Sequence, residues 1–178
     1  MSEYNIGFSE NLIDCAKVLK VHGIDTFEAG QVVIYLSDLS CEITMKAFLE
    51  KAGKPIKEIK SLSHNLSKLL DKFSFCQVKG HTVDDRPIWT SASDVRGLLV
   101  DERHPGLTIG EVLSAEQSGA SKYPNEIRYG DHFTDFHPEI RLQTAIKLLD
   151  WVKTHLDCRY FRDRDNFLKN LTSDASHL

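Results

Sequence analysis

Two charged side chains stand four residues apart in a segment with a helical pattern. Glu42 and Lys46 follow the order that favours an ion pair along a helix, with the carboxylate one turn before the ammonium. An exposed pair of this kind is worth only ~0.3–0.5 kcal/mol and carries no functional meaning. A covered pair must be satisfied within itself or by a neighbour, because an unpaired buried charge is costly. Spacing alone favours the exposed alternative.

A histidine follows in the chain at the predicted start of another helix. His64 comes directly after Ser61-Leu62-Ser63, so we expect it in the first turn, beside unpaired backbone N–H groups. These groups disfavour a charged imidazole, and a neutral ring can act as a base or as a hydrogen-bond partner. The alternative is a histidine that only caps the helix or packs against it.

Arg128 and Tyr129 form a further candidate. An arginine fork beside an aromatic ring can grip a phosphate and stack a base. The arginine can equally clamp the chain by pairing with a buried carboxylate such as Glu42. Metal-independent RNA cleavage needs a base for the 2′-hydroxyl proton and a cation for the developing phosphate charge. Arg128 would supply the cation, and His64, His132 or His137 the base.

The stretch from Asp131 to His137 also contains residue types that ligate metals. Histidine and carboxylate side chains can hold Zn²⁺ or Mn²⁺, but their spacing here matches no metal motif. The next residue, Pro138, is typical of a helix start, so Asp135 or His137 as the helix cap is the simpler interpretation. We therefore predict neither a metal nor a cofactor.

Four helical patterns position these residues. They cover about residues 9–23, 26–52, 61–76 and 138–156. The second pattern is apolar almost all round, which is typical of a central helix. Its main apolar stripe is predicted to be Val32, Leu36, Leu39, Ile43 and Ala47, with Asp25 and Glu28 as a capping box and Gly53 as the stop. The fold class predicted is an all-α, up-and-down bundle of four to five helices, forming a single domain over residues 1–178.

The segment 80–136 interrupts the helical pattern. It holds six of the ten glycines and three of the five prolines, and we expect a long, partly structured insertion before the last long helix. Short helices are predicted near Asp94–Val100 and Ile109–Glu116, the latter with a capping box from Thr108 to Glu111. A long excursion of this kind from a compact domain is often functional.

Composition limits the class of protein. The chain has 178 residues, 41% hydrophobic, four cysteines without a C-x-x-C pair, and a net charge of −4. It lacks an apolar run of the ~20 residues that span a bilayer, and a signal-peptide pattern, so we expect a cytoplasmic protein with no membrane contact. Between Lys46 and Lys79, eight lysines stand against three acidic residues. This stretch is either a solvated helical face or a surface for phosphates.

Three segments resemble the HEPN superfamily of helical proteins. Tyr35–Leu49 is similar to its second helix, an apolar run followed by Glu, three residues, Lys, a small residue and later Leu. Ser63–Leu70 resembles an H-x-L-x-x-L segment, and Arg128-Tyr129 an Arg-Tyr element of some members. The resemblance implies a helical bundle, often dimeric, linked with RNA cleavage, toxin–antitoxin and defence systems, or nucleotide binding.

One departure from the family concerns catalysis. Active HEPN ribonucleases carry an arginine followed after four to six residues by histidine, and Arg141 has no histidine at that distance. The resemblance therefore implies a protein that binds RNA or a nucleotide, and a divergent ribonuclease if it is also catalytic. The binding site would be formed by Glu42, Lys46, His64, Arg128 and Tyr129. The alternatives are a non-enzymatic interaction module, either a homodimer or bound to a cognate partner protein, and a metal-dependent hydrolase using Asp131–His137.

Overall fold

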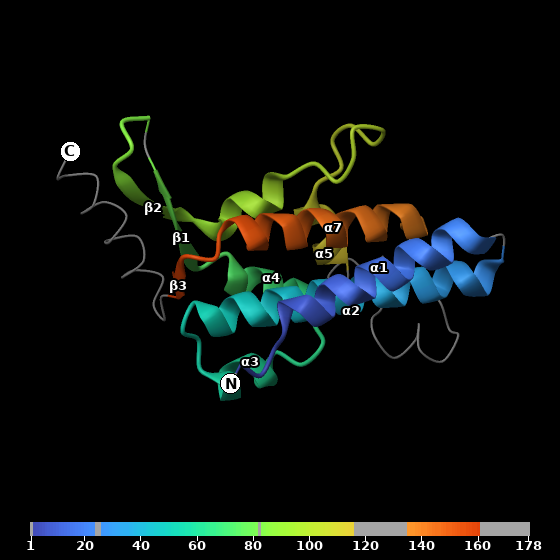
Figure 1. Cartoon of the computed structure of the whole chain (residues 1–178), viewed down its shortest axis with the longest axis horizontal. Helices are drawn as coiled ribbons and strands as arrows, with labels where there is room; N and C mark the ends of the chain where they lie inside the picture. Colours follow the sequence, from blue (N-terminus) through green and yellow to red (C-terminus); the bar gives the residue numbers. More distant parts are fainter. Residues whose placement is uncertain (1, 24–25, 82, 116–134, 161–178) are drawn as a thin grey trace.

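The computed structural model describes residues 2–23, 26–81, 83–115 and 135–160. Over these residues the chain is mainly helical, with a three-stranded antiparallel sheet at one end (Figure 1). The prediction of a mainly helical fold is confirmed, and the prediction of a purely α-helical one is wrong. Within this described part, no helix is long and apolar enough to cross a membrane.

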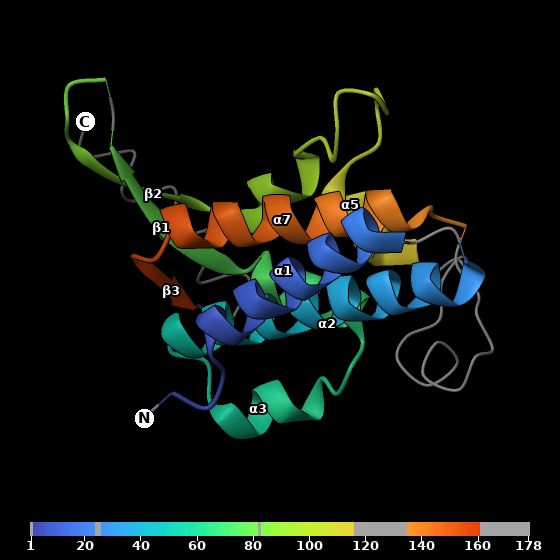
Figure 2. The ribbon, with the colours of Figure 1, turned by 45° about the vertical axis from the view of Figure 1, so that its right-hand side comes forward.

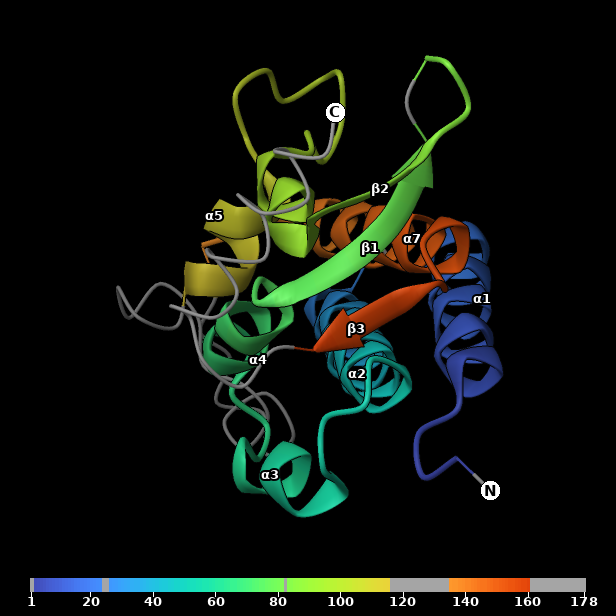
Figure 3. The ribbon, with the colours of Figure 1, turned by 90° about the vertical axis from the view of Figure 1, so that its left-hand side faces the viewer.

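The longest helix, α2 (Phe27–Lys51), is the central element, as predicted. It contacts α1 (Ile6–Gly23), α4 (Leu66–Phe73) and α7 (Pro138–Thr154). Figure 3 shows α1, α2 and α7 side by side. A helix with neighbours on several sides buries side chains around most of its circumference, which explains its nearly continuous apolar pattern.

The helix ends in the structure agree closely with the end signals in the sequence. Thr26 caps α2 by accepting a hydrogen bond from the Ala29 N–H, one residue later than the predicted cap. Gly53 follows the helix with a φ of 90°, a conformation that favours glycine. Pro138 opens α7, and the His137 side chain caps that helix through the Glu139 N–H. The interpretation of His137 as a cap is confirmed.

The face that α2 buries differs from the predicted stripe. Val32 is 45% exposed, whereas the helix buries polar side chains, among them Ser40 and Thr44. The Ser9 hydroxyl of α1 lies 2.7 Å from the Ser40 hydroxyl and 2.6 Å from that of Thr44. Ser9 is therefore not the cap of α1, which starts at Ile6. Serine on both helices lets their backbones approach while the hydroxyls satisfy one another.

A fully buried ion pair joins α2 to α7. Arg141 Nη1 lies 3.2 Å from Asp38 Oδ1, and both side chains are about 1% exposed. Burial raises the pKa of Asp38, and the adjacent guanidinium only partly offsets this. The Phe136 ring centroid lies 5.2 Å from the Arg141 guanidinium. Arg141 is thus a core residue in this fold.

The third predicted helix is shorter than the sequence pattern indicates, and a short helix that was not predicted precedes it. The short helix α3 (Ile56–Ser61) lies at the edge of the bundle, where it contacts α2 and buries Ile59, and a turn connects it to α4 (Figure 2). Helix α4 ends at Phe73, and Cys76 begins strand β1 instead of extending the helix.

The sheet consists of β1 (Cys76–His81), β2 (Pro87–Ser91) and β3 (Cys158–Tyr160), in the order β2-β1-β3. Both neighbours pair antiparallel with β1. The prediction assigned β2 to the insertion, and neither β1 nor β3 was predicted as a strand.

The chain after β2 belongs to the core. It forms the 3₁₀ helix η1 (Ala92–Gly97) and α5 (Ile109–Ser114), whose Thr108–Glu111 capping box is present as predicted. The apolar side chains that it buries are Ala92, Val95, Val100, Ile109, Val112 and Leu113. In this part of the predicted insertion, α5 packs against α4 and α7 and extends the hydrophobic core.

Candidate functional site

The Glu42–Lys46 pair on α2 is buried, which overturns the expectation of an exposed pair. Lys46 Nζ lies 2.7 Å from Glu42 Oε1, and the two side chains are 8% and 5% exposed. Each charge is needed to stabilise the other in this buried position, because removing one partner leaves an uncompensated buried charge. The pair therefore has a structural role, whatever else it does.

His64 joins this pair from the turn before α4. Its Nδ1 lies 3.0 Å from both carboxylate oxygens of Glu42. Ser63, with a φ of 53°, and Asn65, which caps α4 by accepting from the Lys68 N–H at 2.7 Å, hold the turn on either side. His64 therefore precedes the helix cap, and the prediction that it lies in the first turn is wrong.

The contact with Glu42 fixes the chemistry of the imidazole. An ionised carboxylate can only accept hydrogen bonds, so Nδ1 must carry the hydrogen in this contact. In a neutral ring, Nε2 then holds the lone pair and is the atom that can accept a proton. The His64 side chain is 50% exposed, so the ring is anchored at a buried carboxylate and reaches the surface.

Tyr4 completes the cluster, and no sequence pattern predicts it. Its ring lies over the Lys46 ammonium, 5.6 Å from ring centroid to Nζ. Burial is the main cause that raises the pKa of Tyr4, and Lys60 opposes it. Tyr4 is 38 positions from Glu42 in the chain, and no spacing rule relates residues so far apart.

The structure describes only some of the other predicted site residues. Arg128 and Tyr129 lie outside the described residues, as do the positions from Asp131 to Thr134. Among the described residues, no group of three His, Cys, Asp or Glu side chains could hold a metal ion. His137 serves as the cap of α7.

The lysine-rich stretch carries less unbalanced charge than its composition indicates. Within the described part of the chain, four of its eight lysines form ion pairs: Lys46 with Glu42, Lys54 with Glu58, Lys60 with Glu3, and Lys79 with Asp157. Lys54 is itself buried, with its ammonium 3.0 Å from the Tyr160 hydroxyl. The stretch is therefore not a uniform cationic face.

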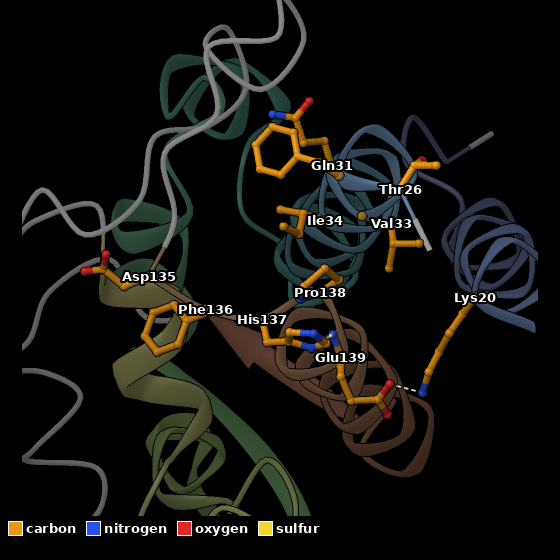
Figure 4. Close-up of a pocket in the computed structure, with 12 residues that line it drawn as sticks. Lys20, Thr26, Gln31, Val33, Ile34, Asp135, Phe136, His137, Pro138 and Glu139 are labelled. Carbon is orange, nitrogen blue, oxygen red and sulfur yellow. Dashed lines mark hydrogen bonds and ion pairs between the residues drawn. The ribbon is translucent and has the colours of Figure 1, made fainter. Parts of the chain in front are cut away.

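A separate cavity of about 750 Å³ lies between the first turns of α2 and of α7. Figure 4 shows Val33 and Ile34 of α2 on one side and His137 and Glu139 on another. Lys20 of α1 forms an ion pair with Glu139 at its edge. The cavity is distinct from the cluster at His64, because the two share no residue.

Comparison with known proteins leaves the family open. No protein-family model, curated protein or solved structure matches this chain. The HEPN resemblance therefore remains a prediction from the sequence, and the geometry at His64 has to support any functional proposal.

Proposed function

We propose that this chain is a HEPN-like protein that binds RNA or a nucleotide at the surface around His64. The observation that supports this most is that the buried carboxylate of Glu42 accepts hydrogen bonds from both Lys46 and His64. Lys46 balances the charge of Glu42, and Glu42 orients the imidazole. An oriented, half-exposed imidazole can accept a hydrogen bond from a ribose hydroxyl or donate one to a phosphate.

The same geometry supports a catalytic form of this function. In RNA cleavage without a metal, Nε2 of His64 would take the 2′-hydroxyl proton while the 2′-oxygen attacks the adjacent phosphate. The P–O5′ bond then breaks, which leaves a 2′,3′-cyclic phosphate, and the departing 5′-oxygen takes a proton from water. A cation must stabilise the charge that develops on the phosphate. The ammonium of Lys46 is paired with Glu42 and covered by Tyr4, so another residue has to supply that cation. Arg128 is the candidate from the sequence.

The test measures binding and cleavage of single-stranded RNAs by purified protein, with and without a chelator. The variants are His64→Ala and Arg128→Ala, and His81→Ala is the control, because His81 is an exposed histidine at the end of β1. We expect binding in the wild type and the control, with loss in the two site variants at unchanged melting temperature. Chelator-resistant cleavage lost in the same variants would establish the catalytic form.

Two outcomes contradict this proposal. Wild-type affinity for RNA and nucleotide in both His64→Ala and Arg128→Ala excludes the assigned site. Absence of binding by the wild type to varied RNAs and nucleotides excludes the function itself.

The alternative function is a non-enzymatic interaction module that forms a homodimer or binds a cognate partner protein. The observation that favours it is a set of exposed apolar side chains on the α1–α2 pair: Phe8, Val18, Val21, Phe27 and Val32, each at least 45% exposed. Exposed apolar surface of this kind often marks an interface. Sedimentation of the wild type and of Val18→Asp tests it. A monomer in both, at concentrations up to the solubility limit, contradicts the homodimer.

A further inference from the structure

A second hollow lies beside the His64 cluster, between the N-terminal segment and the last turns of α2. Its volume is about 610 Å³, which is in the range of sites that hold small ligands. Its lining combines an aromatic residue, apolar groups, an amide, a hydroxyl, a carboxylate and a lysine: Tyr4, Ile6, Ala47, Asn5, Ser2, Glu50 and Lys51. None of these residues belongs to the site predicted from the sequence.

The N-terminal wall of the hollow is held in place by Glu50. One carboxylate oxygen accepts from the Glu3 N–H at 2.9 Å, and the other accepts from the Tyr4 N–H at 3.0 Å and the Ser2 hydroxyl at 2.9 Å. Glu3 in turn pairs with Lys60 of α3 at 2.6 Å. These contacts fix the backbone at Tyr4, so its ring has a defined position before any ligand binds.

Tyr4 connects the hollow to the proposed site. The ring that lines the hollow also lies over Lys46, whose ammonium contacts the same Glu42 oxygen as His64. Tyr4 and His64 thus both contact the buried Glu42–Lys46 pair. Asn5 Oδ1 accepts from the Gly7 N–H at 2.8 Å, which leaves the amide nitrogen of Asn5 to donate to a ligand.

We infer that the hollow binds a nucleobase of the RNA or nucleotide whose ribose or phosphate lies at His64, with Tyr4 as the stacking wall. This inference rests on the proposed function. Stacking on an aromatic ring is the interaction that nucleobases of every sequence share. Lys51, exposed at the edge of the hollow, pairs with a backbone phosphate next to that base.

The test uses a short single-stranded RNA that contains 2-aminopurine, a base whose fluorescence falls when it stacks on an aromatic ring. Affinity and quenching are measured for the wild type, Tyr4→Leu and Tyr4→Phe, and a mononucleotide is tested beside the RNA. We expect Tyr4→Leu to lose the quenching and bind about 5- to 100-fold more weakly. Tyr4→Phe keeps the ring and should retain both. Phe75→Leu is the matched control, because it removes another ring that lies over a lysine, Lys72.

The outcomes separate this inference from the proposed function. If His64→Ala weakens binding while Tyr4→Leu binds and quenches like the wild type, the nucleobase site is wrong and the proposed function stands. If the wild type binds neither RNA nor mononucleotide, both are wrong. Photocrosslinking of wild-type protein to RNA containing 4-thiouridine needs no variant. Crosslinks at residues 2–6 or 47–51 support the site, and crosslinks confined to other segments overturn it.

Discussion

Replacing Arg141 by Met leaves the Asp38 carboxylate buried without the guanidinium that now lies 3.2 Å away. Asp38 is completely buried, and its Oδ2 has no hydrogen-bond partner in the described part of the chain. Removing one member of a buried pair typically costs about 3–5 kcal/mol. In a protein of this size each kcal/mol lowers the melting temperature by about 2–4 °C, so we expect a fall of roughly 6–20 °C.

The loss should depend on pH in a defined direction. The pKa of Asp38 is already raised by burial, and Arg141 opposes that rise, so the pKa rises further in Arg141→Met. A carboxyl with a raised pKa binds its proton more tightly in the folded state. Stability therefore falls as the pH rises from the unfolded pKa to the folded one, and this window is wider in the variant. The difference between variant and wild type should grow from acidic to neutral pH.

Urea unfolding at several pH values, followed by circular dichroism, measures both effects. The set includes Asp38→Asn and the double variant Asp38→Asn/Arg141→Met, because the coupling energy separates the pair from other contacts of Arg141, such as Phe136. We expect the double variant to recover part of the stability that Arg141→Met loses. A loss below about 1 kcal/mol at neutral pH, independent of pH, would refute the burial of a charged pair.

Three further predictions concern local structure. Gly53→Ala should cost about 1–2 kcal/mol in unfolding free energy, because a φ of 90° is strained for alanine. No atom blocks a side chain at this position. Gly97→Ala is the control and should cost less, because Gly97 is equally unobstructed and has no positive φ. Thr108→Ala should lose about 1 kcal/mol with the capping box of α5, and an unchanged melting curve would contradict that. Burial would raise the pKa of Glu50, but hydrogen bonds from residues 2–4 outweigh it and lower the pKa below 4.5. The stability that Glu50 contributes, measured against Glu50→Gln, should thus be present above pH 4.5 and disappear as the pH falls through its folded pKa.

Helix ends could be predicted from the sequence because their signals are local. Gly53, Pro138 and the Thr108 capping box mark the ends of α2, α7 and α5 within a few residues of where the structure has them. Strand β1 was not predicted because Cys76 continues the apolar spacing of the preceding helical pattern, and because one of its two partners, β3, lies about 80 residues away in the chain. Short strands that depend on such distant partners show little pattern of their own.

The inward face of α2 was also beyond sequence reasoning. A helix that is apolar almost all round does not reveal which side is covered. The buried hydroxyl of Ser40 is explained only by Ser9 on α1, and the buried carboxylate of Asp38 only by Arg141 on α7.

The candidate site was predictable in part. The spacing of Glu42 and Lys46 correctly indicated a contact within one helical turn, because helix geometry alone determines it. Their burial depends on Tyr4 and on the His64 turn, which arrive from other segments. Spacing within a helix cannot report what covers the helix, and that was the source of the wrong expectation of an exposed pair.

Glu42 both pairs with Lys46 in the core and contacts His64, and variants can separate these two roles. Lys46→Met leaves the carboxylate in contact with His64 but removes its balancing charge, so stability should fall by up to about 3–5 kcal/mol. Replacing both members, as Glu42→Leu/Lys46→Met, removes the buried charges together and should restore much of that stability. The double variant nevertheless removes the carboxylate that accepts from His64 Nδ1, so the imidazole loses this anchor. If Glu42 serves function through His64, this variant is stable and binds RNA weakly. If it is stable and binds like the wild type, Glu42 and Lys46 belong to the core alone, and the site must be sought elsewhere on the chain.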